Sequence, residues 1–193
     1  MHHSNEQPAA SPRAPTLRDR VCEWMSPLEF RRATQRDERE IVELVHSEAL
    51  NPFDLDWRRF VVATRGAGVL GAVQLRQHAD GSRELASLVV RPEMRRRGIA
   101  SRLIDAALAC APAQVFLISR VALAARYVRW GFRSIDPATA PVPVKRNYYL
   151  GLVLGGILAL LSGRRRNPLT VLQRHAGAHG QSACPPGRAG QTA

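Results

Sequence analysis

The sequence has few cysteines and no motif typical of a metal site or of export. Cys22, Cys110 and Cys184 are the only cysteines in 193 residues, and they are odd in number and widely separated. This spacing argues against a disulfide framework and a cysteine metal site, and no two histidines have ligand spacing, so we expect no metal. The first residues also lack the apolar segment of a secretory signal. These absences predict a protein of the reducing cytoplasm.

Long apolar runs are also missing. The longest uninterrupted run, residues 150–161, has 12 residues, whereas a membrane-spanning helix needs roughly 20. The length favours a buried or groove-lining apolar helical insert over residues 148–163. Three arginines follow at 164–166, so a peripheral membrane contact or a dimer contact through residues 148–166 is the alternative, because basic residues beside an apolar helix suit an anionic surface.

Both ends of the chain contain little that could be buried. Residues 1–27 and 176–193 are rich in Pro, Ala, Gly, Ser and Gln, a composition typical of disordered tails. The part between them has a normal length for one domain. We therefore expect a single domain over residues 28–175.

Acidic residues are scarce in one half of the chain. The net charge is +12, yet residues 1–90 hold 12 Arg and 13 Asp or Glu, while residues 91–175 hold 15 Lys or Arg and three acidic residues. This distribution fits an anionic ligand in the second half. A nucleic-acid-associated protein would also be basic, but aromatic residues make up only 6% of the chain and no recognisable nucleic-acid-binding module is present.

Hydrophobic periodicity predicts strands first and then a crossover. A short strand near residue 29 precedes a helix that begins at Thr34, with Asp37 completing a capping box. The further strands are expected at 60–64, 68–77, 83–90, 113–120 and 169–175, and helices at 98–111 and 121–130. Asp80 and Gly81 form the turn of a hairpin, and Gly131 provides a left-handed C-cap for the second of these helices.

The junction of residues 88–103, LVVRPEMRRRGIASRL, concentrates arginines where a strand gives way to a helix. The first N–H groups of a helix have no partner inside the helix, and the helix dipole adds positive charge there. Gly98 and Ala100 allow close approach to the main chain, and Arg95, Arg96 and Arg97 offer charged contacts to phosphate oxygens. The junction therefore predicts a pyrophosphate-binding site.

This junction resembles the acyl-CoA signature of the GNAT superfamily of N-acetyltransferases, with Arg95, Gly98 and Ala100 at the signature positions. The segment FRRATQRDEREIVELV resembles the family's first strand and helix, RELASLVV its fourth strand, and ARYVRWGFRSID its late helix with Tyr127. The resemblance implies an α+β fold of three layers: a mixed, mostly antiparallel central sheet, helices on both faces, and a splayed strand pair that holds acyl-CoA.

The resemblance also implies the cosubstrate-binding residues. The pantetheine arm would bond to main chain at Leu88, Val89 and Val90. The pyrophosphate would rest on the turn and the helix start. The complete set of expected cofactor-binding residues is Leu88, Val89, Val90, Arg95, Arg96, Arg97, Gly98, Ile99, Ala100, Ser101 and Arg120.

Two side chains are catalytic candidates. Tyr127 is placed by the resemblance to protonate the leaving thiolate; alternatively it only packs on its helix. Glu84, which the two-residue period puts on the same side of its strand as Ala86 and Leu88, is the candidate general base; alternatively it is an exposed carboxylate paired with an arginine. The histidines at 46, 78 and 175 look like surface or loop residues.

We thus expect an acetyl-CoA-dependent enzyme in which a primary amine attacks the thioester directly through a tetrahedral intermediate. The amine acceptor, whether a small molecule, a peptide or a protein, cannot be read from the sequence. A non-catalytic acyl-CoA-binding or sensor module is the rival interpretation, and a nucleic-acid-associated protein is the third.

Overall fold

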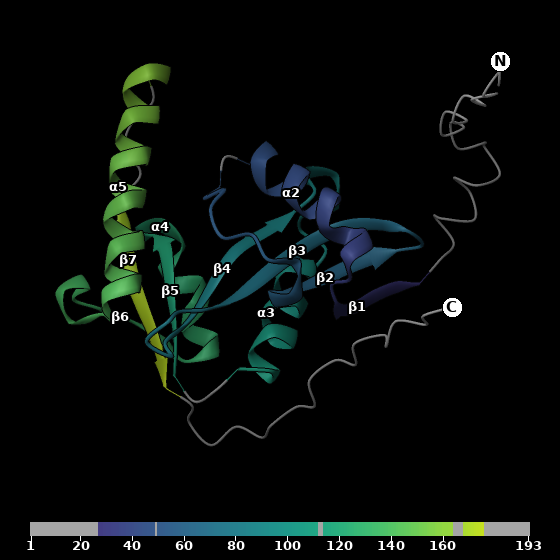
Figure 1. Cartoon of the computed structure of the whole chain (residues 1–193), viewed down its shortest axis with the longest axis horizontal. Coiled ribbons are helices and arrows are strands. Elements are labelled where there is room, and N and C mark those ends of the chain that lie inside the picture. Colours follow the sequence, from purple (N-terminus) through teal and green to yellow (C-terminus); the bar gives the residue numbers. More distant parts are fainter. Residues whose placement is uncertain (1–26, 49, 112–113, 164–167, 176–193) are drawn as a thin grey trace, which may run out of the picture.

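A computed structural model describes residues 27–48, 50–111, 114–163 and 168–175. Its seven strands form one sheet in the order β1-β2-β3-β4-β5-β7-β6 (Figure 1). The strands are β1 (Leu28–Arg32), β2 (Phe60–Arg65), β3 (Gly68–Gln77), β4 (Arg83–Val90), β5 (Gln114–Arg120), β6 (Phe132–Ile135) and β7 (Leu169–His175). The helices are α2 (Glu38–Ser47), α3 (Ile99–Ala109), α4 (Val121–Tyr127) and α5 (Val142–Ser162).

All neighbouring strands are antiparallel except β4 and β5, which α3 connects as a parallel pair. The sheet is therefore mixed and mostly antiparallel, and the expected fold class is confirmed. The expected strands at 68–77 and 83–90 have the observed bounds of β3 and β4. The short strand β6 was not expected, and the expected tails lie outside the described residues, apart from Pro27.

The two faces of the sheet are covered by different helices. On one face, α3 and α4 pack on a core that includes Leu85, Leu117 and Phe132. On the other face, α2 packs on residues such as Phe60 and α5 packs on Phe116. We call these the α3/α4 face and the α2/α5 face. They are separated by the sheet, and β4 and β5 lie at the middle of both (Figure 1).

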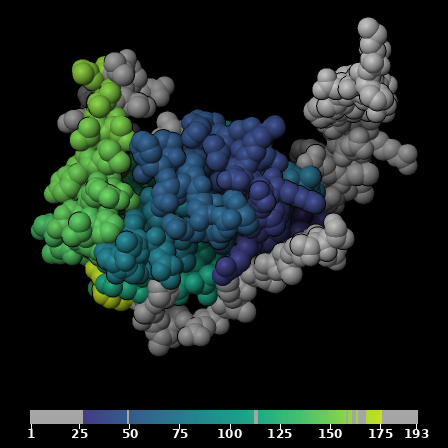
Figure 2. All heavy atoms as spheres, viewed as in Figure 1, coloured from purple at the N-terminus to yellow at the C-terminus, as the bar shows by residue number. Residues whose placement is uncertain are grey.

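Helix α5 begins six residues before the expected insert, at Val142, and is only partly buried. Val144 is fully buried against Phe116 and Val171, whereas one stripe of its surface is exposed: Tyr149, Val153, Ile157 and Leu160. The end of the helix projects beyond the other elements (Figures 1 and 2). A wholly buried helix is therefore excluded. None of the helices in the described ranges combines the length and apolarity that a membrane crossing requires.

Cys110, directly after α3, is disulfide-bonded. The sequence spacing had argued against a disulfide, and that expectation is wrong for this residue. Cys22 and Cys184 lie outside the described residues.

The expected capping box is present at the start of the first helical segment. Asp37 Oδ2 accepts hydrogen bonds from the Thr34 backbone N–H at 2.7 Å and from the Thr34 hydroxyl at 2.8 Å. The same carboxylate accepts hydrogen bonds from Nη1 and Nη2 of Arg31 on β1, each at 2.8 Å. Burial opposes ionisation of Asp37, but the bonds from Arg31 and Thr34 outweigh it and hold the pKa of the carboxyl below its usual value.

This lowered pKa makes a prediction about acid stability. A carboxyl whose pKa is lower in the folded state stabilises the fold above its unfolded pKa, and that contribution is lost as pH falls through the folded value. We expect Asp37→Asn to lower the free energy of unfolding at pH 7 by about 1–3 kcal/mol. In urea unfolding, the difference from wild type should shrink below about pH 4. A difference independent of pH would show that the charge of Asp37 contributes nothing.

Candidate active site

Strands β4 and β5 pair at one end and diverge at the other. Their ladder joins Glu84 to Phe116 and Leu85 to Leu117, and it contains no further pairs among the described residues. Residues 86–90 of β4 and 118–120 of β5 extend beyond these pairs. The main chain of β4 on that side is therefore free of a neighbouring strand at Leu88, Val89 and Val90, the residues expected to bind a pantetheine arm.

A β-bulge interrupts β4 at this place. Gln74 pairs with Ala86 and Ala72 pairs with Val89, so Ser87 and Leu88 together oppose Val73 alone. Ser87 takes the left-handed φ of 51°. A bulge reverses the alternation of side chains: Leu88 packs with the core of the α3/α4 face. The expectation that Leu88 shares a face with Glu84 is therefore wrong, because the bulge lies between them.

The junction before α3 forms a tight turn. Arg96 and Gly98 both have left-handed backbones, with φ of 61° and 75°. The first helical hydrogen bond runs from Arg102 N to Gly98 O at 3.1 Å, so the N–H groups of residues 99–101 emerge at the helix end. A Cβ built on Gly98 meets no atom within 4 Å. The amides of residues 99–101 thus have no partner within the helix, and there is open space beside Gly98, an arrangement that fits a phosphate group.

The expected cosubstrate residues differ in how their side chains are placed. Ile99 is buried in the core and can offer only its main chain. Arg95 is already engaged: its Nε donates to Val90 O at 3.1 Å, and Nη2 lies 2.5 Å from Glu48 Oε1. The side chains of Arg96, Arg97 and Arg120 are also exposed. Arg95 therefore connects the turn to the end of β4 through a hydrogen bond. Arg96, Arg97 and Arg120 are the arginines available to bind an anion.

Tyr127 lies at the end of α4 on the α3/α4 face. Its ring stands edge-on to Phe132 at a centroid distance of 6.1 Å and lies 6.1 Å from the ring of Trp130. Burial raises the pKa of the phenol, while a hydrogen bond with the Ser119 side chain and the charge of Arg126 oppose this in part. Ser119 belongs to the diverging end of β5. The phenol is thus a protonated group fixed beside that end of the strand pair.

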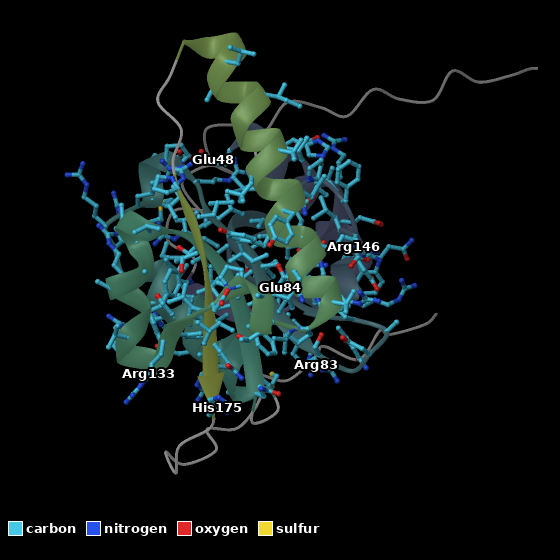
Figure 3. All side chains as sticks on the ribbon, turned by 90° about the vertical axis from the view of Figure 1, so that its left-hand side faces the viewer. Glu48, Arg83, Glu84, Arg133, Arg146 and His175 are labelled. Carbon is cyan, nitrogen blue, oxygen red and sulfur yellow. The ribbon has the colours of Figure 1, made fainter. Side chains whose placement is uncertain are left out.

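Glu84 lies on the opposite, α2/α5 face and is only 4% exposed. Its Oε2 is 2.9 Å from His78 Nε2 and accepts a hydrogen bond from Asn147 Nδ2 of α5, also at 2.9 Å. Figure 3 shows Glu84 beside α5, near the middle of the view. The alternative of an exposed carboxylate paired with arginine is therefore wrong. So is the surface assignment of His78, which is 8% exposed.

Asn147, Gln74 and Arg76 were not anticipated as site residues. Gln74 and Arg76 alternate with apolar residues along β3 and resemble the solvent-facing side of a strand. They are instead buried on the α2/α5 face, because the segment before β2 covers them: Gln74 Nε2 donates to Asp54 O at 2.6 Å, and Arg76 Nη2 donates to Phe53 O at 2.9 Å. Within the described ranges, no group of three or more His, Cys, Asp or Glu side chains could hold a metal ion.

The sheet with its diverging parallel pair has the same fold as acyl-CoA-dependent acyltransferases of known structure. N-acetylglutamate synthase from Neisseria gonorrhoeae, complexed with coenzyme A and N-acetyl-glutamate, matches with a TM-score of 0.57 at 18% identity over 78% of this chain. The match covers 35% of that enzyme, so this chain spans only about a third of its length. Rv2747 from Mycobacterium tuberculosis, in complex with CoA and NLQ, matches with a TM-score of 0.58 at 22% identity, over 77% of this chain and 99% of that one.

A third structure, an acyl-CoA N-acyltransferase from Pseudomonas aeruginosa, matches with a TM-score of 0.55 at 18% identity, over 77% of this chain and 99% of that one. Residues 56–134 match the family model described as an acetyltransferase (GNAT) domain. Together with the shared fold, this match supports the GNAT superfamily, as the signature predicts. No curated protein matches the sequence.

Proposed function

We propose that this protein is an N-acetyltransferase that moves the acetyl group of acetyl-CoA to a primary amine. The observation that carries the proposal is the divergence of β4 and β5, with a partly buried phenol on one face of the sheet and a buried carboxylate on the other. Acid and base are thereby separated by the strand pair between which an extended thioester would lie. A binding module without turnover has no need for this pair of groups.

The cosubstrate would be held mainly by main chain. The amides of residues 99–101 and the open space beside Gly98 suit the pyrophosphate, with charge from Arg96 and Arg97. The unpaired edge of β4 at Leu88, Val89 and Val90 suits the amide groups of the pantetheine arm, which would add to it like a strand. Bound in this way, acetyl-CoA supplies an activated thioester.

The chain's own groups then move the protons. Glu84 accepts a proton from the incoming ammonium, so that a neutral amine attacks the thioester directly. His78 and Asn147 fix the orientation of the carboxylate through its Oε2 atom. Tyr127 donates its phenolic proton to the departing thiolate. A main-chain N–H near Val90 stabilises the charge that develops on the carbonyl oxygen.

Two similar structures support this proposal. The Neisseria enzyme is a synthase of N-acetylglutamate crystallised with coenzyme A, and the Mycobacterium protein was crystallised with CoA. Each has the same fold as this chain. These two structures are similar to this chain only in fold, so the acceptor of this chain must be identified by experiment.

The direct test is calorimetric titration of the purified protein with acetyl-CoA, followed by a thiol-release assay over a panel of amines. We expect saturable binding and release of CoA thiol that depends on both the amine and the enzyme. Binding without turnover on any amine would favour the sensor module. Absence of binding, together with retardation of RNA or DNA that weakens steeply with salt, would favour the nucleic-acid-associated protein.

Replacing Glu84 tests the base. Glu84→Gln keeps the shape of the side chain and an oxygen that accepts from Asn147, so we expect CoA affinity to be retained while kcat falls about tenfold or more. The exposed Glu38 of α2 provides the control, and Glu38→Gln should leave kcat unchanged. Equal kcat in wild type and Glu84→Gln would remove Glu84 from the mechanism.

Two further proposals concern the setting of the enzyme. We propose a cytoplasmic location. We also propose residues 148–166 as a contact to a membrane surface or a second copy, supported by the exposed stripe from Tyr149 to Leu160 on α5. Vesicle sedimentation and analytical ultracentrifugation distinguish these two partners.

A further inference from the structure

A row of buried polar side chains follows β3 on the α2/α5 face. Gln74, Arg76 and His78 are 0%, 3% and 8% exposed. Arg76 is the cross-strand partner of Glu84, and the Cβ atoms of directly opposed residues lie about 4.5–5.5 Å apart. The side chains of Arg76 and Glu84 therefore start from directly opposed positions on one face of the sheet. The guanidinium of Arg76 contacts Phe53 and Gln74, and the carboxylate of Glu84 contacts His78 and Asn147.

The guanidinium of Arg76 is incompletely satisfied. Its Nη2 donates to two neutral acceptors, Phe53 O at 2.9 Å and Gln74 Oε1 at 3.2 Å. Its Nε is buried and makes no hydrogen bond to any described residue, although it lies 3.1 Å from Asp54 Oδ2. A buried cation is costly unless an anion and good hydrogen bonds compensate it. Arg76 thus retains donor capacity for a better-placed carboxylate.

Asp54 is the anion that now approaches Arg76, and its position is unusual. Its side chain is 51% exposed, against 4% for that of Arg76, so it reaches inward from the surface. Its backbone φ of 58° is left-handed, a region that residues with a Cβ rarely adopt, Asp and Asn being the most tolerant. Asp54 also lies within 3.4 Å of Arg59 Nη1, which gives its carboxylate an alternative partner at the surface.

We infer that Arg76 is the binding site for a carboxylate of the acceptor, and that Asp54 occupies this place in the free protein. The inference rests on the proposed function and specifies its acceptor. Because Arg76 and Glu84 lie directly opposite each other on neighbouring strands and on one face of the sheet, one small acceptor can present its amine to Glu84 and its carboxylate to Arg76. The acceptor class is therefore the free amino acids. A protein or peptide N-terminus has an amide where this site takes a carboxylate.

The first arm of the test compares free α-amino acids with their amides in the thiol-release assay. An acceptor amide has no charge with which to replace Asp54 beside the buried guanidinium, so we expect kcat/KM to be about tenfold or more lower for the amides. The variant Asp54→Asn removes the competing charge and tolerates the left-handed backbone. It should lower KM for the acids relative to the amides. Asp56→Asn, in the same segment, is the matched control and should leave this ratio unchanged.

The second arm removes the guanidinium and measures binding as well as turnover. Arg76→Gln and Arg76→Lys should each abolish the preference for acids over amides. Lys is included because it keeps the charge and loses the two-pronged geometry. Calorimetric titration of the CoA-saturated protein with amino acids provides a readout that needs no catalysis. Thermal unfolding and CoA affinity show whether each variant is folded.

The outcomes separate this inference from the proposed function. The carboxylate site is supported if Asp54→Asn binds the acids more tightly than wild type does and both Arg76 variants lose this binding. This conclusion holds even if no thiol is released. Absence of thiol release would overturn only the proposed transferase activity. Equal use or equal binding of acids and amides by wild type overturns the carboxylate site, as does an unchanged preference in a folded Arg76 variant. The carboxylate site is also overturned if no amino acid binds to either wild type or Asp54→Asn.

Discussion

Tyr127→Phe should reduce kcat about a hundredfold while CoA affinity changes little. The variant keeps the ring that packs against Phe132 and Trp130 and removes only the hydroxyl, which is the proton donor in the proposed reaction. Burial raises the pKa of this phenol, so the wild-type group stays protonated at neutral pH and is available as an acid. Steady-state kinetics together with CoA titration measure the two effects separately.

The pH dependence distinguishes chemistry from packing at Tyr127. A departing thiolate needs a proton most at pH values below the pKa of a free thiol, which is about 8.5. The deficit of Tyr127→Phe should therefore shrink as pH rises past that value. Tyr149→Phe, on the exposed stripe of α5, is the matched control and should behave as wild type. A deficit constant from about pH 6.5 to about pH 9.5, a range that spans the thiol pKa, would assign Tyr127 a structural role.

Gly98→Val should weaken CoA binding about a hundredfold, which corresponds to about 2.7 kcal/mol. Gly98 has a φ of 75° and open space around its missing Cβ, so valine would disfavour the left-handed turn and place a branched side chain beside the amides of residues 99–101. The backbone strain costs about 1–2 kcal/mol of stability. Calorimetric titration with CoA gives the affinity, and urea unfolding gives the stability.

Gly81 is a close control for this experiment. It also has a left-handed backbone, with φ of 83°, and nothing within 4 Å of a built Cβ, but it lies in the hairpin between β3 and β4. Gly81→Val should lose similar stability and keep the wild-type affinity for CoA. If the two variants bind CoA equally well, the anion-binding role of the turn before α3 must be abandoned.

Local sequence patterns were sufficient for most of the sheet. The bounds of β3 and β4 are set by apolar alternation and by an Asp-Gly turn, both of which lie within a few residues of the strands they define. The strand β6 has only four residues, and Arg133 and Ser134 at its centre are exposed, so it carries no periodic signal. The expected start of α5 was too late because Lys145, Arg146 and Asn147 precede the apolar run from which the insert was predicted.

The candidate site was predictable in part, for the same reason. The turn at Gly98 and the residue Tyr127 belong to contiguous motifs. The environment of Glu84 does not: His78 lies just beyond the end of β3 and Asn147 comes from a helix 63 residues further along the chain. Arg76 is buried by the backbone of Phe53, 23 residues before it. Contacts between residues so far apart do not affect the local sequence pattern. The alternation of polar and apolar residues is therefore the same for a strand whose polar side faces solvent and for one whose polar side is buried.

The divergence of β4 and β5 has a consequence for how such a protein can change over evolutionary time. In the proposed function the cosubstrate is gripped by peptide groups at Leu88, Val89, Val90 and the start of α3, and every amino acid carries the same peptide group. Substitutions in this stretch that preserve the bulge and the turn leave the grip intact. The side chains that would meet the amine, Glu84 near the start of β4 and Arg76 on β3, lie outside this stretch, so the acceptor can change while the thioester donor stays the same.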